Sequence, residues 1–165
     1  MLFVRRTTLD DLEEILKIYA SARDHMARSG NPDQWGRSFP PEELIREDIE
    51  NGVNRAVCDE EGICGVFAPT FGAEDSSYGV IVGGEWPNDE PYVTIHRIAS
   101  GGRRSGIFEC AFEYCKTISP NIRIDTHEKN LKMRHLIEKH GFHYCGKIYA
   151  WNGTMRLAYQ WTADK

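Results

Sequence analysis

The stretch from 95 to 107 combines the residue types of an anion-binding site. An apolar segment ending in Ile98 and Ala99 runs through a Gly- and Arg-rich loop, which holds two adjacent arginines, into the helical pattern at 105–116. Free N–H groups at a helix start, the positive end of its dipole and two cations suit a phosphate or pyrophosphate. The same residues also fit an ordinary glycine turn with solvated arginines, and they lack the glycine patterns of dinucleotide folds and phosphate loops.

A candidate general base lies on the strand that leads into this loop. His96 is the first candidate, because an imidazole can accept a proton near neutral pH. Glu85, in the loop just before that strand, is the second, and Asp125 and His127 at the end of the next predicted strand follow. A buried His held by hydrogen bonds is the alternative interpretation of His96, and the sequence does not decide between the two.

Apolar periodicity predicts the elements that position these residues. Strands are expected at 2–5, 56–58, 63–67, 78–82, 92–99, 121–126, 142–150 and 155–161, and helices from Thr8 to before Ser29 and at 42–50, 105–116 and 130–140. Asn152-Gly153 is a hairpin signal between the last two strands. This order predicts one α+β domain over residues 1–165, with a mixed, mostly antiparallel sheet flanked by helices.

Composition and charge exclude several classes of protein. The formal net charge is -5, without a basic tract, which makes nucleic acid an unlikely partner. The apolar runs are far shorter than a membrane span or a signal peptide requires, so we expect a soluble, cytoplasmic chain without a membrane partner. The 5 cysteines are odd in number and lack a C-x-x-C pair, which is typical of reduced structural thiols. The histidines lack metal-site spacing, and no metal is expected.

Two motifs and the order of elements resemble the GNAT superfamily of acetyl-CoA-dependent N-acyltransferases. Arg103-Arg104-Ser105-Gly106-Ile107 is similar to the first five positions of the family's pyrophosphate loop, [RQ]-x-x-G-x-[GA]. Asn130 opens a helix that ends in Glu138-Lys139-His140-Gly141-Phe142, which looks like the second family motif, E-K-x-G-F. The resemblance spans nearly the whole chain.

The resemblance implies a cofactor site and an acceptor site. Backbone N–H groups of the loop would hold the pyrophosphate of acetyl-CoA, Ile98 and Ala99 would contact the pantetheine arm, and Asn130 would contact the distal arm. A backbone N–H near Ile98 would hold the oxyanion. Trp35 falls where the family builds its acceptor wall, as an aromatic lid or as a packing anchor, and we nominate it, with Glu85, to bind the acceptor. The loop residues nominated for the pyrophosphate are Arg103, Arg104, Ser105, Gly106 and Ile107.

Two positions depart from the family pattern. Phe108 stands at the sixth loop position, where the family has Gly or Ala, and we expect it to join Phe112 in the core. Ile137 stands where many relatives carry a Tyr thought to protonate the leaving thiolate. Because a thiol of pKa near 8.5 leaves tolerably as a thiolate, an acid there helps less than correct positioning does.

The sequence therefore predicts transfer of an acetyl group from acetyl-CoA to a primary amine of a small molecule or peptide, by direct attack in a ternary complex. Residues 71–91 carry five acidic side chains and no basic one; this segment either attracts a cationic acceptor or is a solvated loop. A catalytically silent acyl-CoA-binding module, favoured by Phe108 and Ile137, and a phosphate-ligand binder are the alternatives. The sequence does not fix the oligomeric state, and a homodimer is one option.

Overall fold

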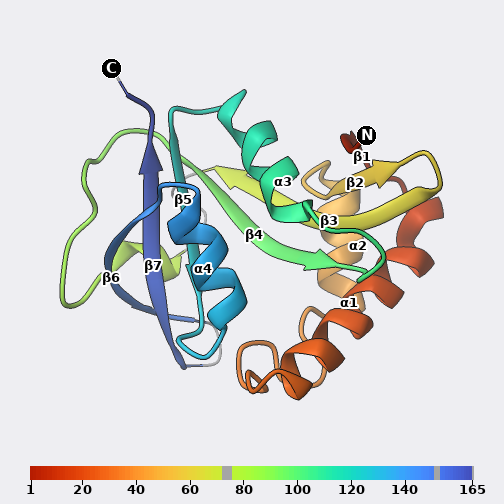
Figure 1. Cartoon of the computed structure of the whole chain (residues 1–165), viewed down its shortest axis with the longest axis horizontal. Coiled ribbons are helices and arrows are strands. Elements are labelled where there is room, and N and C mark those ends of the chain that lie inside the picture. The colour runs from red at the N-terminus through yellow and green to blue at the C-terminus, as the bar shows by residue number, and fades with distance from the viewer. Residues whose placement is uncertain (72–75, 151–152, 165) are drawn as a thin grey trace.

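The computed structural model describes residues 1–71, 76–150 and 153–164. Its strands form one seven-stranded sheet in the order β1-β2-β3-β4-β5-β7-β6, antiparallel throughout except for the parallel pair β4 and β5 (Figure 1). This confirms the predicted fold class. The elements in chain order are β1 (Phe3–Arg6), α1 (Leu12–Arg28), α2 (Glu42–Glu50), β2 (Arg55–Asp59), β3 (Gly62–Phe71), β4 (Val93–Ser100), α3 (Ile107–Lys116), β5 (Asn121–Thr126), α4 (Leu131–Lys139), β6 (His143–Tyr149) and β7 (Met155–Thr162).

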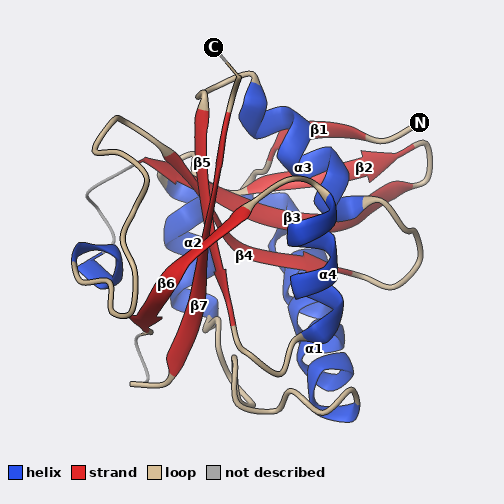
Figure 2. Ribbon diagram, turned by 60° about the vertical axis from the view of Figure 1, so that its left-hand side comes forward, coloured by secondary structure: helices blue, strands red, loops and turns tan. Residues whose placement is uncertain are grey.

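The helices pack on the two faces of the sheet (Figure 2). Alternate residues of a strand point to opposite faces, and β2 shows this directly: Val57 packs in the cluster with α3 and α4, whereas Ala56 packs in the cluster with α1 and α2. On β3, Phe67 and Val66 divide in the same way. Each face of the central strands is therefore covered, which keeps the sheet rigid beneath the site.

The predicted helix boundaries follow from local capping. A short 3₁₀ turn at 9–11 leads into α1, and the Thr8 N–H donates to the Asp11 carboxylate over 2.9 Å, as a capping-box start predicts. The helix ends at Arg28, before the predicted stop. At the start of α4, the Asn130 side-chain oxygen accepts a hydrogen bond from the Met133 N–H at 3.2 Å.

One predicted strand is wrong. Residues 76–79 form a 3₁₀ turn, and of the expected strand at 78–82 only Val82 pairs, in an isolated bridge with Lys147. The apolar residues there serve a different purpose, because Tyr78 is buried against Ile148 in a small third core cluster. The hairpin between β6 and β7 forms as predicted, with Tyr149 opposite Met155, although Asn152 itself lies outside the described residues.

The feature that positions the site is the separation of β4 from β5 (Figure 1). The two strands pair only at Val93 with Ile122 and at Thr94 with Arg123, after which β4 continues to Ser100 without a partner from β5. Because β3 pairs with the other edge of β4, the second half of β4 turns one edge of its backbone toward the gap.

Candidate active site

A cleft of about 130 Å³ opens where β4 and β5 separate. Its walls come from residues 95–98 of β4, from β5, from the loop after α1, from the first turn of α4 and from the β6–β7 hairpin. A mostly apolar hollow with a few polar groups at a gap in a sheet is a common setting for a ligand site. We call this hollow the cleft below.

A β-bulge explains why four consecutive residues of β4 line the cleft. Ala68 pairs with His96 and Val66 with Ala99, so Phe67 stands opposite two residues, and Arg97 takes a φ of 49°. Such a conformation is unfavourable for a non-glycine residue and is kept only where the surroundings fix it. Here the Arg97 carbonyl accepts a hydrogen bond from the Tyr19 hydroxyl at 2.7 Å.

The Arg97 side chain is fixed as well. Its guanidinium donates to both carboxylate oxygens of Asp48, at 2.8 and 3.1 Å, and both side chains are largely buried. Burial raises the pKa of Asp48 despite the opposing effect of Arg97. The pair thus anchors the bulge to α2 and leaves little charge at Arg97 for a ligand.

His96 lies in the cleft, half-buried, with its ring centroid 5.9 Å from that of Tyr78. The Tyr78 hydroxyl donates to Asp125 at 2.6 Å, and Asp125 lines the cleft from β5. His96 and Asp125 therefore converge on one hollow from the two separated strands. This arrangement suits proton transfer, with an imidazole and a carboxylate near the same ligand.

Glu85 is not brought to the cleft, which corrects its predicted roles as base and acceptor ligand. Its side chain is exposed and is not part of the lining. The residues on either side of Glu85 pack against the rest of the protein. The Trp86 ring stacks on the Tyr78 ring with 5.3 Å between centroids, and Gly84 lies so close to the Cys145 carbonyl that a Cβ would clash with it. The described acidic residues of 76–91 likewise lie outside the lining, and Glu74 and Asp75 fall outside the described residues.

Trp35 lies in the wall of the cleft, as predicted. Its ring makes edge contacts with Tyr19 at 5.7 Å and Phe39 at 6.3 Å, and the residue is buried. Contact between Trp35 and an acceptor stays a prediction. His127 is also buried, and burial lowers its pKa, but its ring accepts from the Lys129 N–H and it does not line the cleft.

Besides Arg97, two polar residues of the cleft were missed by sequence reasoning. Gln34 ties the loop after α1 to the start of α4, because its side-chain oxygen accepts from the His127 N–H and from the Asn130 amide, each at 3.2 Å. Arg156 is buried beneath it and donates to the Gln34 carbonyl. The available sequence signal was a charged residue, Arg156, directly before the apolar run Leu157-Ala158-Tyr159 of a predicted strand.

The loop between β4 and α3 keeps its main-chain donors available. Gly102 donates to the Ser100 hydroxyl at 3.1 Å, whereas in the described parts of the chain the N–H groups of residues 103–106 have no acceptor. Gly106, with a φ of 88°, is the N-cap of α3, and Ile107 begins the helix. Open amides at a helix start form a cradle that fits a pyrophosphate.

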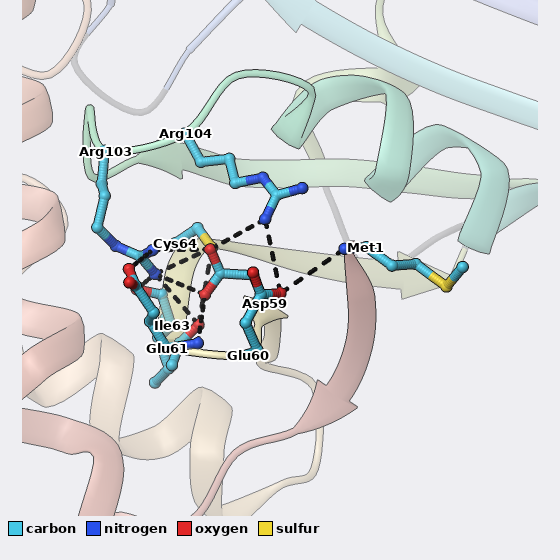
Figure 3. Close-up of polar contacts among 9 residues, drawn as sticks. Met1, Asp59, Glu60, Glu61, Ile63, Cys64, Arg103 and Arg104 are labelled. Atoms are coloured by element: carbon cyan, nitrogen blue, oxygen red, sulfur yellow. Dashed lines mark hydrogen bonds and ion pairs between the residues drawn. The ribbon is translucent and has the colours of Figure 1, made fainter.

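The arginine side chains of this loop, by contrast, are already engaged (Figure 3). Arg103 donates to both oxygens of Asp59, at 2.7 and 3.0 Å, and to Glu61 at 3.0 Å; Arg104 donates to Asp59 at 3.1 Å. These bonds, those from Arg103 first, hold the pKa of Asp59 well below its usual range. Both side chains brace the loop against the β2–β3 turn, and their contact with an anionic cofactor stays a prediction.

The other nominated cofactor residues divide by burial. Ile98 lines the cleft, whereas the Ala99 side chain is buried with α1, so only its main chain can meet a ligand. Ser105 is exposed on the loop. Asn130 reaches the cleft, but its amide caps α4 and bonds Gln34, which makes it a support of the wall.

The two departures from the family pattern are both in the core. Phe108 is buried, and its ring centroid lies 6.3 Å from that of Phe112 and 6.1 Å from that of Phe142. This is the core position expected for a residue that does not block the loop. Ile137 is fully buried in the same cluster. Position 137 therefore supplies no proton to the cleft.

The cysteines, the possible metal ligands and the helices were each compared with the expectations from the sequence. All five cysteines are free, and burial raises the pKa of each thiol, which agrees with structural use. Over the described ranges, His, Cys, Asp and Glu side chains form no group of three able to hold a metal ion. None of the helices in the described parts has the length and apolar character needed to cross a membrane.

Comparison with known proteins identifies the family. No protein-family model matches the chain, and no curated protein sequence does. Among solved structures, an acetyltransferase of the GNAT family from Streptococcus agalactiae 2603 is 30% identical, with a TM-score of 0.87 over 99% of this chain and 96% of that chain.

More distant structures share the fold. A GNAT-family acetyltransferase from Bacillus cereus ATCC 10987 is 18% identical, with a TM-score of 0.66 over 100% of this chain and 99% of that one. A third GNAT-family acetyltransferase, from Listeria monocytogenes 4b F2365, is 20% identical, with a TM-score of 0.65 over 98% of this chain and 94% of that chain. The Streptococcus relative matches this chain over almost the whole length of both proteins, and the motifs and the separated strands agree with that match. This chain therefore belongs to the GNAT family of acetyltransferases.

Proposed function

We propose that this chain transfers the acetyl group of acetyl-CoA to a primary amine of a small molecule or peptide, by direct attack in a ternary complex. The observation that carries the proposal is the gap after Thr94, which has an open amide loop at one end and a cleft containing His96 at its side. A cytoplasmic location is part of the proposal, and the five free thiols support it.

The residues present fit the cofactor. The free N–H groups of residues 103–106 and the positive end of the α3 dipole suit its pyrophosphate. The unpaired edge of β4 suits the amides of the pantetheine arm, by the hydrogen bonding that adds a strand to a sheet. When bound, acetyl-CoA supplies an activated acyl group as its thioester.

His96 would prepare the acceptor. An alkyl amine of pKa about 10 is protonated at neutral pH, and its deprotonation costs roughly 4 kcal/mol. The Asp125 carboxylate would first attract the ammonium form of the acceptor into the cleft. His96 would then take its proton, directly or through water. A main-chain N–H of the β4 bulge near Ile98 would donate to the oxygen on which negative charge develops.

A thermal titration separates this proposal from simpler binding. A ligand at 100 times its dissociation constant adds about 2.7 kcal/mol of stability, so acetyl-CoA and CoA should both raise the unfolding midpoint and ADP should raise it less. Free thiol released from acetyl-CoA with a panel of amines then measures turnover. A midpoint unmoved by acetyl-CoA contradicts the cofactor site, and an equal response to ADP favours a phosphate-ligand binder.

Replacing the base tests the catalytic assignment. His96→Gln should lower kcat by about 100-fold or more at neutral pH, with little change in acetyl-CoA affinity. His143→Gln, at an exposed position of β6 outside the cleft lining, is the matched control and should keep wild-type turnover. Unchanged turnover in His96→Gln would assign the proton to water or to Asp125.

A catalytically silent acyl-CoA-binding module is the second candidate. The isoleucine at position 137 favours it, because its hydrocarbon side chain has no proton to give to the leaving thiolate. Such a module would bind acetyl-CoA in the thermal titration and release no thiol above the hydrolysis blank with any amine.

A further inference from the structure

The cleft contains a buried arginine, Arg156, for which the described residues supply no ion-paired carboxylate. Arg156 is 2% exposed and lines the cleft from β7. Its guanidinium donates to the Gln34 carbonyl and to the Thr154 hydroxyl. Within the described residues it makes no ion pair with a carboxylate.

Two other arginines of this region are bound in different ways. Arg97 forms a two-pronged ion pair with Asp48. Arg123 lies 3.9 Å from the Trp86 ring centroid and 3.8 Å from that of Tyr92, donates to Gln160 at 2.8 Å, and does not line the cleft. Arg156 differs from Arg97 because it has no ion-paired carboxylate within the described residues, and from Arg123 because it lines the cleft.

A buried cation without a counter-ion is costly, and arginine stays protonated under all ordinary conditions. Burial lowers the pKa of Arg156, with Asp125 and Asp33 acting only as weaker opposing charges. An anion that enters the cleft would offset this cost. A carboxylate matches the planar fork of a guanidinium.

We propose that Arg156 binds a carboxylate of the acceptor, so that the substrate is an amine that also carries a carboxylate, as a free amino acid does. The inference rests on the proposed acetyl transfer. Asp125 in the same lining gives the cleft one negative and one positive group, which matches a zwitterion. Asp125 also disfavours a doubly charged phosphate in this small volume, which is why a monoanionic carboxylate is the better fit.

Matched pairs of amines test the proposal by turnover. We would compare L-phenylalanine with 2-phenylethylamine, and L-methionine with 3-(methylthio)propylamine, in the thiol-release assay with saturating acetyl-CoA. The member that carries the carboxylate should have a kcat/KM about 10-fold or more higher, as expected for a hydrogen bond between charged groups. O-phospho-L-serine and L-serine, compared in the same assay, separate phosphate from carboxylate recognition. A preference for the amines without a carboxylate would overturn the proposal.

Variants assign the preference to one side chain. Arg156→Gln should remove the preference, mainly by raising KM for the carboxylated amines, and Arg156→Lys should keep part of it. Arg123→Gln is the matched control, because it also removes a buried arginine but outside the cleft. It should lower the unfolding midpoint and leave the preference intact. A preference that survives in a folded Arg156→Gln protein would contradict the proposal.

A binding measurement keeps the test independent of turnover. N-acetyl-L-phenylalanine should shift the NMR signal of the Arg156 Nε–H, assigned by its loss in Arg156→Lys, and N-acetyl-2-phenylethylamine should not. If every amine fails to release thiol, acetyl transfer is rejected and the carboxylate site is judged by this signal alone. An Arg156 signal that the carboxylate leaves unmoved at saturation overturns the site, whatever the result for turnover.

Discussion

Arginines occupy two regions of this molecule in opposite electrostatic states. In the loop between β4 and α3, Arg103 and Arg104 are partly exposed and bound to the Asp59 carboxylate (Figure 3). In the cleft, Arg156 is almost completely buried and bonded to neutral oxygens. The region that the sequence marks as cationic is therefore neutralised by the protein, and the region that the sequence leaves unmarked holds the buried charge.

The difference separates two ways of binding an anion. In the loop, main-chain N–H groups and a helix dipole remain available, and the arginines serve to fix the backbone that carries them. In the cleft, a single side chain offers its donors directly. The first kind of site depends on backbone conformation, whereas the second depends on one guanidinium, and substitutions can distinguish them.

The largest effect is expected from Gly106. Gly106→Trp should weaken acetyl-CoA binding by about 100-fold, because a side chain at φ 88° is strained and a bulky ring would cover the open amides. Its Cβ would meet only Leu2, at 3.4 Å, so the domain should still fold. The measurement is the dissociation constant by calorimetry.

A glycine of the same backbone conformation provides the control. Gly30, after α1, has a φ of 86°, and a Cβ added there would have no neighbouring atom within 4 Å. Gly30→Trp carries similar backbone strain outside the loop and should leave acetyl-CoA affinity within about twofold. Equal losses in the two variants would mean that strain, and not the loop amides, accounts for the result.

The role of the loop arginines is tested through their acidic partner. If Arg103 braces the loop, Asp59→Asn and Arg103→Gln should each lower acetyl-CoA affinity by about 10-fold, and the double variant should lose no more than either alone. If Arg103 instead contacts the pyrophosphate, Asp59→Asn would free it and raise the affinity. Glu61→Gln is the control, because Glu61 also bonds Arg103 but is exposed and should contribute little.

Sequence patterns predicted the frame of the site well because that frame depends on local rules. Capping residues and apolar spacing fixed α1, α2, α3 and α4 to within a few residues, and the position of Phe108 in the core followed from its spacing to Phe112. The loop amides and His96 were also located, since both belong to one strand–loop–helix segment.

What escaped prediction depends on contacts between distant segments. The bond between Arg156 and Gln34 joins residues 122 positions apart, and the bond between Arg103 and Asp59 joins residues 44 apart. The exposure of Glu85 follows from how Trp86 stacks on Tyr78. Neither periodicity nor a motif reports such pairings, so the sequence could not show which charges the fold neutralises.

Acid should weaken the braced loop and leave the protonation of the cleft arginine unchanged. The pKa of Asp59 is lowered in the folded state, chiefly by Arg103, so its contribution to stability is present above the ordinary value of 3.8 and is lost as the pH falls below it. Urea unfolding between pH about 6 and about 3 should show wild type losing stability more steeply than Asp59→Asn. Asp11, whose pKa is lowered by its hydrogen bond with Arg5, should make the stability of both proteins fall somewhat with decreasing pH. Parallel slopes would contradict the bracing role.

The smallest effect is expected from Tyr19, which hydrogen-bonds the main chain of a further arginine of the cleft, Arg97. Tyr19→Phe removes the hydrogen bond to the Arg97 carbonyl and should cost about 1 kcal/mol of stability. Because that carbonyl belongs to the bulge that lines the cleft, kcat should fall several-fold as well. Tyr114→Phe removes a similar bond, from Arg55 at 3.0 Å, away from the cleft, and should lower stability without changing kcat. If both variants left kcat unchanged, the bulge geometry would not limit the reaction, and the Asp48 carboxylate alone would be sufficient to hold Arg97 in place.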